Sequence, residues 1–278
     1  MTPAVVGLVL CAAVMHAGWN ALLRSGTDRM WSVTVMSLAM TVVAIPAALL
    51  LPLPAPASWP YIGLSSVLQL AYSLFLILAY RHGDLGQVYP IARGCVPLLV
   101  TLGAAVFAGE RLGPVSLAGV GLVSLGIMSL ALAKGSGTRG SIAAALVTGV
   151  IVASYTVSDG LGVRLAGDPY AYSTWIFLIY GVEMPLLFLL VRRKTAFSVT
   201  WPETLKAAAG GLTSLVTYVV VLWAILLSPI GPVSALRETS IVFAALIGRV
   251  FLRETLTPRR LGACAVIAAG AFCLSYRF

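Results

Sequence analysis

Long apolar runs set the architecture of this chain of 278 residues. Ten such runs are separated by short connectors that carry Gly, Pro and charged residues. About 20 consecutive apolar residues are enough for a helix to span a bilayer. The sequence therefore predicts an all-α integral membrane protein with ten transmembrane helices. The expected helices cover residues 3–23, 31–52, 60–80, 87–108, 113–133, 141–164, 170–191, 204–227, 231–252 and 258–276.

The composition excludes the soluble classes. Hydrophobic residues make up 60% of the chain and charged residues 10%, whereas soluble domains carry about 25% charged residues. A soluble domain of this size cannot cover its surface with so few charges. The same figures exclude disordered chains and small disulfide frameworks. No connector is long enough for a domain outside the membrane, so the function is expected in or across the bilayer.

The cations and cysteines narrow the possible partners. The net charge is +9 (18 Lys and Arg minus 9 Asp and Glu), but most of the cations lie in the short connectors, in runs of three at most. No basic helix or patch interleaved with aromatic residues exists, so nucleic acid is not an expected partner and the lipid bilayer is. The four cysteines lie inside apolar runs without metal spacing, and we expect no metal, no cofactor and no catalytic residue.

The distribution of Lys and Arg predicts the orientation. Eleven of them lie in the connectors after the odd-numbered helices, against three in the other connectors and the C-terminus. The positive-inside rule then places the odd-numbered connectors in the cytoplasm and both termini outside. No Lys or Arg precedes Arg24, so the run over 3–23 is expected to be a retained first span rather than a signal peptide.

The sequence also repeats itself at a constant offset. Residue pairs such as Arg93 and Arg237 are 144 positions apart (237 − 93). We expect one integrated transmembrane domain built from two five-helix repeats, residues 1–135 and 136–278. An odd number of spans inverts one repeat, an arrangement associated with alternating-access transporters that bind substrate between the repeats, around a central cavity. One chain supplies both repeats, so a monomer suffices, although a dimer remains open. The other matching pairs are Phe107 and Phe251, Glu110 and Glu254, Leu112 and Leu256, Pro114 and Pro258, Leu117 and Leu261, and Gly126 and Gly270.

Ionisable side chains at membrane depth are costly and mark candidate functional sites. Arg93 and Arg237 each lie about 10 Å into the fourth helix of their repeat, at 1.5 Å per residue. A guanidinium binds a carboxylate or phosphate through two parallel hydrogen bonds, so both are candidates for binding an anionic substrate group. The alternative is a structural ion pair with Glu238, Asp159 or Glu183. These three acids are also the candidates for coupling transport to protons.

Polar and aromatic side chains complete the candidate cavity. Some of them share a helix face, as His16 does with Asn20, Tyr155 with Asp159 and Tyr89 with Arg93. The alternatives are hydrogen bonds between helices or an interfacial aromatic belt. The alternatives for Asp159 are a helix-end carboxylate that faces water and a pair with Arg164. Glu110 and Glu254 are expected to cap the helix that follows each of them. The remaining candidates for substrate binding are His16, Trp19, Asn20, Tyr72, Tyr80, Tyr89, Tyr155, Ser158, Thr217 and Tyr218.

The whole chain resembles the drug/metabolite transporter superfamily, EamA type. The junction Ala108-Gly109-Glu110-Arg111-Leu112 precedes Gly119, Gly121 and Gly126, and its repeat Leu252-Arg253-Glu254-Thr255-Leu256 precedes Gly262 and Gly270. The segment His16-Ala17-Gly18-Trp19-Asn20 is a further family cue, whereas Arg253 stands where the family usually has Gly. The resemblance implies a multi-pass transporter of small solutes in the bacterial inner (plasma) membrane, with YddG-like amino-acid exporters as the suggested subtype.

The absence of known nucleotide-binding and catalytic motifs favours a secondary transporter over an ATP-driven transporter or an enzyme. No GxxxxGK[ST] loop is present, so ATP is not the expected driver, and no HExxH, GxSxG or paired-aspartate motif indicates an intramembrane enzyme. We therefore expect a secondary transporter that exports small metabolites, amino acids above all, by alternating access. An organophosphate or nucleotide-sugar exchanger and a drug/proton antiporter remain as alternatives, because arginine also binds phosphate and Asp159 could bind a cation.

Overall fold

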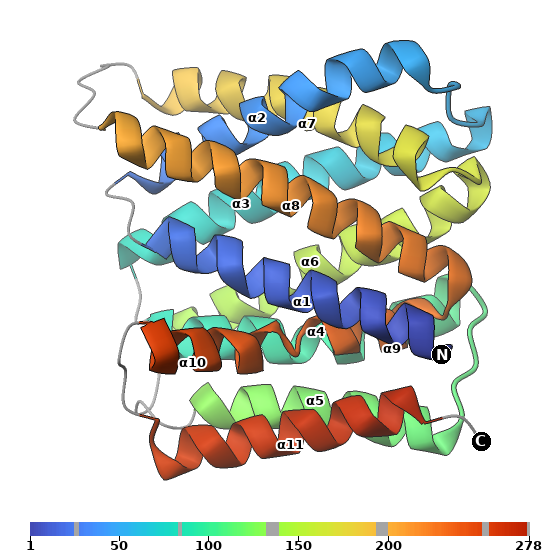
Figure 1. Cartoon of the computed structure of the whole chain (residues 1–278), viewed down its shortest axis with the longest axis vertical. Helices are drawn as coiled ribbons and strands as arrows, with labels where there is room; N and C mark the ends of the chain where they lie inside the picture. The colour runs from blue at the N-terminus through green and yellow to red at the C-terminus, as the bar shows by residue number, and fades with distance from the viewer. Residues whose placement is uncertain (25–27, 83–84, 132–138, 193–199, 252–255, 277–278) are drawn as a thin grey trace.

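The computed structural model describes residues 1–24, 28–82, 85–131, 139–192, 200–251 and 256–276, which contain helices and no strands. The helices lie side by side in a bundle (Figure 1). They are α1 (Pro3–Arg24), α2 (Arg29–Leu50), α3 (Trp59–His82), α4 (Leu85–Phe107), α5 (Pro114–Ala131), α6 (Arg139–Ala166), α7 (Pro169–Val191), α8 (Trp201–Leu227), α9 (Ile230–Arg237), α10 (Ser240–Phe251) and α11 (Pro258–Ser275). A short 3-10 helix, η1 (Pro56–Ser58), precedes α3.

The ninth expected helix, over 231–252, is interrupted in the structure. The backbone hydrogen bonds change there from the α-helical to the shorter 3-10 pattern, with the N–H of Thr239 donating to the carbonyl of Leu236 at 3.2 Å. The hydroxyl of Thr239 donates to the same carbonyl at 2.7 Å. Such a tightened turn inside a helix often marks a hinge or a functional site, and here it carries the buried Glu238 between α9 and α10.

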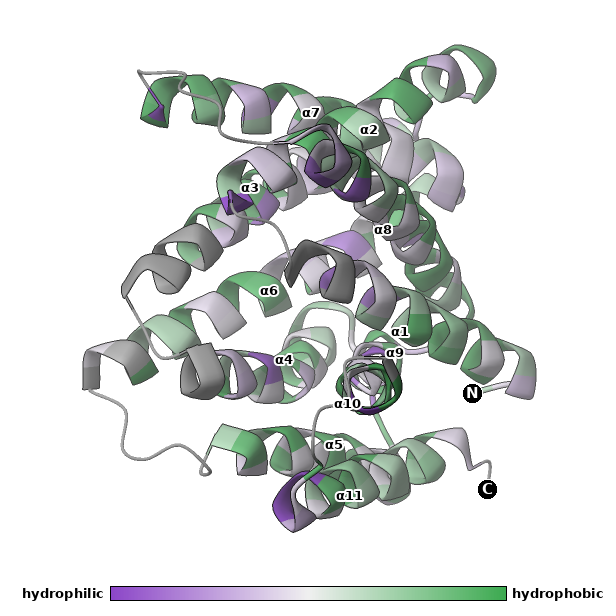
Figure 2. Cartoon of the chain, turned by 60° about the vertical axis from the view of Figure 1, so that its left-hand side comes forward, coloured by the Kyte–Doolittle hydropathy of each residue, from purple (hydrophilic) through white to green (hydrophobic). Residues whose placement is uncertain are grey.

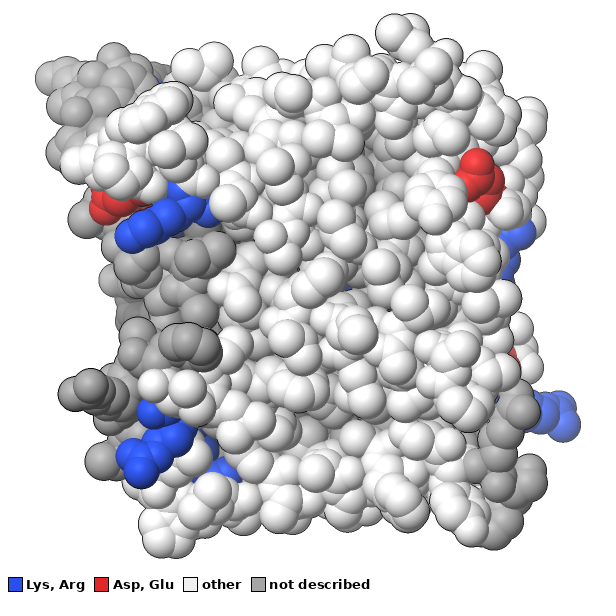
Figure 3. All heavy atoms as spheres, viewed as in Figure 1, with Lys and Arg blue, Asp and Glu red and all other residues white. Residues whose placement is uncertain are grey.

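Length and composition make this chain a multi-pass membrane protein. Eight segments of the described helices are long and apolar enough to cross a membrane, and α3 and α11 are not among them. Large apolar side chains are exposed, such as those of Leu49 and Leu50 at 84% each, and much of the helix ribbon in Figure 2 has the green of hydrophobic residues. In Figure 3 the visible charged side chains gather near two opposite edges, with a wide uncharged band between them. Lipid is the natural environment of such a band.

Close helix pairs join the two halves of the chain. The largest contacts include those of α1 with α8, α3 with α6, α2 with α7, α4 with α6 and α5 with α11. In each of these pairs one helix precedes residue 136 and the other follows it. The hydrophobic core lies between them and includes Val9 of α1, Val96 of α4 and Leu236 of α9. The halves therefore form one continuous core.

Glycines allow α5 and α11 to approach closely. A Cβ atom added to Gly270 would lie 2.8 Å from the carbonyl oxygen of Gly119. One added to Gly126 would lie 2.7 Å from the side chain of Ile267. Small residues at a helix contact are typical of packing within membranes. The Gly-spaced helices expected from the resemblance thus pack against each other.

The expected role of Glu110 is wrong in one respect. It was expected to cap α5, the helix that follows it, but it accepts hydrogen bonds from the backbone N–H of Ile230, at the start of α9. It also pairs with Arg164 of α6 at 2.6 Å. The helix α5 begins with Pro114, which has no N–H to donate, and the fold brings α9 within reach instead. Its repeat counterpart Glu254 lies outside the described residues.

Candidate functional site

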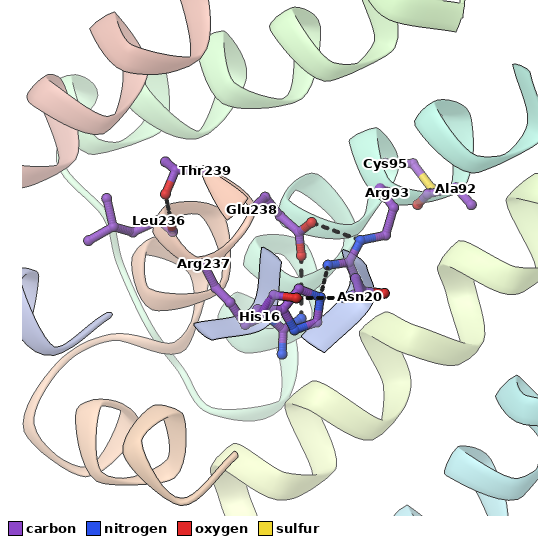
Figure 4. A network of polar contacts seen from close by, with 9 residues as sticks. All are labelled: His16, Asn20, Ala92, Arg93, Cys95, Leu236, Arg237, Glu238 and Thr239. Atoms are coloured by element: carbon purple, nitrogen blue, oxygen red, sulfur yellow. Dashed lines mark hydrogen bonds and ion pairs between the residues drawn. The ribbon is translucent and has the colours of Figure 1, made fainter. Parts of the chain in front are cut away.

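Buried charged residues from two helix regions meet at one place. Arg93 comes from the first half of α4, whereas Arg237 and Glu238 come from the end of α9 and the break that follows it. Their exposed fractions are 5%, 8% and 0%. Figure 4 shows these three side chains with His16 of α1 beside them. We call these four residues the arginine cluster.

A single carboxylate lies between the two arginines. The Nε atom of Arg93 is 3.0 Å from Oε2 of Glu238, and Nη2 of Arg237 is 3.4 Å from Oε1 of the same residue. Nη2 of Arg93 is also 3.2 Å from Nε2 of His16, and its guanidinium lies 5.9 Å from the centre of the Tyr89 ring. Two arginines that are 144 positions apart in the sequence therefore meet at one carboxylate.

The arginine cluster carries an excess positive charge. Two guanidinium groups face one carboxylate, and arginine stays charged in proteins. A buried charge without full compensation is costly. Nε of Arg237 is buried and makes no hydrogen bond, whereas Nε of Arg93 has Oε2 of Glu238 as its ion-pair partner. An anion that bridged the arginines would supply acceptors and cancel the excess charge.

Glu238 is the acidic partner among the three that were proposed. In the part of the chain that the structure describes, neither Asp159 nor Glu183 forms an ion pair with the arginines. Glu183 accepts a hydrogen bond from Ser66 at 3.3 Å, and its other oxygen has no hydrogen-bond partner. The proposed pair of Asp159 with Arg164 is wrong, because Arg164 pairs with Glu110 and with carbonyl groups at the end of α8.

Asp159 instead forms a second polar cluster with hydroxyl groups. This residue of α6 is 3% exposed. It accepts hydrogen bonds from the hydroxyls of Tyr218 at 2.8 Å and Tyr172 at 3.3 Å, and from that of Ser65. Gln69 donates to Ser65 at 3.0 Å and to Tyr218 at 3.4 Å. We call these five residues the aspartate cluster.

Aromatic rings line the region of the two clusters. Trp19 stands edge-on to the His16 ring with centroids 5.0 Å apart, and its Nε1 is buried without a hydrogen-bond partner. The rings of Tyr72 and Tyr155 lie 6.3 Å apart. Tyr155 is within electrostatic reach of both arginines, of Glu238 and of Asp159. Tyr155 is therefore near members of both clusters.

The remaining candidates make local contacts. The amide of Asn20 donates to the His16 carbonyl of its own helix at 2.8 Å, and the hydroxyl of Thr217 donates to the Thr213 carbonyl at 2.8 Å. The hydroxyl of Ser158 donates to the carbonyl of Tyr61 at 3.3 Å. The side chain of Tyr80 lies outside the described part of the structure.

Sequence reasoning missed three members of the aspartate cluster: Ser65, Gln69 and Tyr172. Ser65 and Gln69 are four residues apart, so they form a polar stripe on one helix face. That is the pattern by which His16 and Asn20 were selected. Tyr172 carries no such signal, because an aromatic residue near a helix start is typical of the membrane interface.

Comparison with known proteins identifies a transporter domain. Residues 139–276 match the model of the EamA-like transporter family. A solved structure described as "Crystal structure of protein" has a TM-score of 0.81 to this chain at 20% identity and covers 99% of each chain. That likeness shows the fold alone. No curated protein matches the chain. The family consists of transporters rather than enzymes and indicates a membrane transporter of small molecules.

Proposed function

We propose that this chain, whose residues 139–276 form an EamA-like transporter domain, is a secondary transporter for small metabolites that bear a carboxylate. Amino acids are the foremost substrate class, and the direction is export across the bacterial inner membrane by alternating access. The observation that carries this proposal is the arginine cluster, in which Arg93 and Arg237 share the single carboxylate of Glu238. A substrate carboxylate would accept the remaining guanidinium hydrogen bonds.

The helix contacts support two inverted five-helix repeats that comprise ten spans. Exchange of the halves maps α1 onto α6, α2 onto α7, α3 onto α8, α4 onto α9 with α10, and α5 onto α11. If the repeats are related in this way, each contact between two helices should have a counterpart between the two matching helices. The contact of α1 with α8 has its counterpart in the contact of α6 with α3, and both are present. The contact of α4 with α6 has its counterparts in the contacts of α9 and α10 with α1, which are also present. A single chain carries both repeats, so a monomer suffices for transport.

Competition for the arginines links binding to movement between the repeats. Arg93 belongs to α4 and Glu238 to the break between α9 and α10, so their ion pair ties the two repeats together. A substrate carboxylate that takes over Arg93 weakens this tie, because both acids need the same donors. Binding then favours a different arrangement of the repeats, as a ligand shifts an equilibrium only through differential contacts. The turn at Glu238 and Thr239 is the natural hinge.

The test is uptake of labelled amino acids into proteoliposomes. Arg93→Gln and Arg237→Gln each remove a charged donor, and such hydrogen bonds contribute about 1.5–3 kcal/mol, roughly a tenfold to hundredfold change in affinity. Arg111→Gln is the matched control, because Arg111 is exposed in the connector between α4 and α5. We expect uptake to fall in the first two variants and to persist in the control.

Other outcomes separate the alternatives. Undiminished uptake in both buried variants would overturn the carboxylate site. Uptake of phosphate esters in exchange for inorganic phosphate, without amino-acid uptake, would favour the organophosphate exchanger, because the same guanidinium groups bind phosphate. Uptake of hydrophobic cations that depends on Asp159 alone would favour the drug/proton antiporter.

A further inference from the structure

We propose that the aspartate cluster is the cation-binding pole of the substrate site, and that the substrate class is therefore zwitterionic, with an ammonium and a carboxylate group. This inference rests on the proposed transport function and refines it. The arginine cluster binds the carboxylate, and Asp159 binds the ammonium group. Four features of the structure support this assignment.

The first feature is a buried carboxyl group that is held by hydroxyl groups. Tyr218, Tyr172 and Ser65 donate to Asp159, and no Lys or Arg side chain forms an ion pair with it among the described residues. Hydroxyl groups orient a carboxylate without neutralising it. A carboxylate offers about four lone-pair sites, so three hydroxyl donors leave room for an ammonium N–H.

The second feature is the aromatic environment of this carboxylate. Tyr172 and Tyr218 touch it through their hydroxyl groups, and Tyr155 precedes it by one turn on the same face of α6. The Phe177 ring lies 5.3 Å from the Tyr218 ring. The faces of aromatic rings attract cations. A carboxylate among tyrosines is thus suited to an ammonium group with an apolar neighbour.

The third feature is a tyrosine that lies near both clusters. Tyr155 and Asp159 are four residues apart on a helix, which corresponds to about 6 Å along the axis. Both arginines act electrostatically on Tyr155, and Arg237 also acts on Asp159. Tyr155 is therefore near both clusters. An α-amino acid carries its charged groups on the same carbon atom, so it needs binding groups that lie close together, as groups near one tyrosine do.

The fourth feature is the balance of charge. The arginine cluster has one excess positive charge, and Asp159 carries one negative charge when it is ionised. A zwitterion supplies the opposite charge to each. A simple anion would leave Asp159 without its cation, and a simple amine would leave the arginines without their anion. Specificity follows from these unpaired buried charges, since they penalise the wrong ligand.

The experiment compares three probes that share one ring and differ in their charged groups. L-Phenylalanine has both groups, 3-phenylpropionate lacks the ammonium, and phenethylamine lacks the carboxylate. Each is tested as a competitor of labelled L-phenylalanine and by direct binding to the purified full-length protein. The measured quantity is the preference ratio, the affinity for L-phenylalanine divided by that for 3-phenylpropionate.

We expect the wild type to prefer the zwitterion at least tenfold over each of the other probes. Asp159→Asn keeps the shape and a hydrogen-bond acceptor but removes the charge, and we expect it to bring the preference ratio close to one while 3-phenylpropionate still binds. Arg237→Gln should weaken the binding of L-phenylalanine and of 3-phenylpropionate by a similar factor, because both probes carry a carboxylate. Asp168→Asn is the matched control, because Asp168 caps α7 and asparagine caps a helix equally well.

The outcomes distinguish this inference from the proposed function. If Asp159→Asn weakens the binding of L-phenylalanine and of 3-phenylpropionate by the same factor, Asp159 has a structural role. The proposal that Asp159 binds the ammonium group is then overturned, while the proposed carboxylate site stands. If the wild type binds none of the three probes, both proposals fail for this substrate class. If Asp159→Asn does not fold, Tyr218→Phe removes the 2.8 Å hydrogen bond that orients Asp159. An unchanged preference ratio in that variant would also overturn the inference.

Discussion

The backbone N–H of Ile230 donates hydrogen bonds to both carboxylate oxygens of Glu110, at 3.0 and 2.9 Å. Glu110 lies between α4 and α5, whereas Ile230 begins α9. A negative charge at a helix start also favours the positive end of the helix dipole. A side chain of the first half therefore anchors the helix that carries Arg237 in the second half.

Glu110→Gln should destabilise the protein by about 1–3 kcal/mol, because it weakens a charged cap and leaves Arg164 without its carboxylate. Thermal unfolding in detergent measures this loss. Arg164→Gln should cost a similar amount, and the double variant should cost less than the sum of both, with a coupling of about 0.5–3 kcal/mol.

Glu203→Gln is the control for this comparison of the two single variants with the double variant. Glu203 belongs to the exposed capping box of α8, where glutamine also serves. We expect its unfolding temperature to stay near that of the wild type. Additive losses for Glu110 and Arg164 would show that their 2.6 Å pair contributes no coupling.

Glu238→Gln should be more damaging than its double variant with Arg93→Gln. The single change leaves two buried guanidinium groups facing a neutral amide, and removal of one partner of a buried pair costs about 3–5 kcal/mol. The double variant removes one of these cations as well, so part of the stability should return. Thermal unfolding of the four proteins of this cycle gives the comparison. A double variant that is less stable than Glu238→Gln would contradict the view that excess positive charge dominates this cluster.

Local patterns predicted much of this fold and part of the site. Hydropathy located the helices, and the offset that pairs Arg93 with Arg237 identified two residues that meet at one carboxylate. Hydropathy did not reveal the break at Glu238 and Thr239, because the flanking residues continue as one apolar run. Hydropathy assigns a residue to a helix, but it does not show with which distant backbone group the side chain forms a hydrogen bond. The partner of Glu110 and the contact of Tyr172 with Asp159 depend on how the helices pack.

The proposed orientation predicts opposite accessibility at two connectors. In a variant without the four native cysteines, Ala57→Cys lies in an even-numbered connector and Thr200→Cys in an odd-numbered one, and both parent residues are exposed. The positive-inside rule predicts that a membrane-impermeant thiol reagent labels position 57 in intact cells and position 200 only after the membrane is opened. The reverse pattern would invert the topology, and labelling of both positions in intact cells would contradict an odd number of spans between them.

The close contact of α5 and α11 predicts a difference between two glycines of the same helix. A Cβ on Gly270 would lie 2.8 Å from the carbonyl oxygen of Gly119 and 2.9 Å from the backbone nitrogen of Val123. Because backbone atoms cannot move aside singly, the helices must separate, and we expect Gly270→Ala to cost about 1–3 kcal/mol. A Cβ on Gly262 meets nothing within 4 Å, so Gly262→Ala should be neutral or stabilising by up to about 1 kcal/mol.

Thermal unfolding of both glycine variants in the same detergent tests this difference. The two substitutions add the same methyl group to the same helix, so helix propensity affects both alike and the difference reports the contact alone. Equal stabilities would mean that α5 and α11 do not pack through Gly119 and Gly270. A lower stability of Gly270→Ala that a second change, Val123→Ala, partly restores would locate the strain, because the side chain of Val123 is also 2.8 Å from the added Cβ.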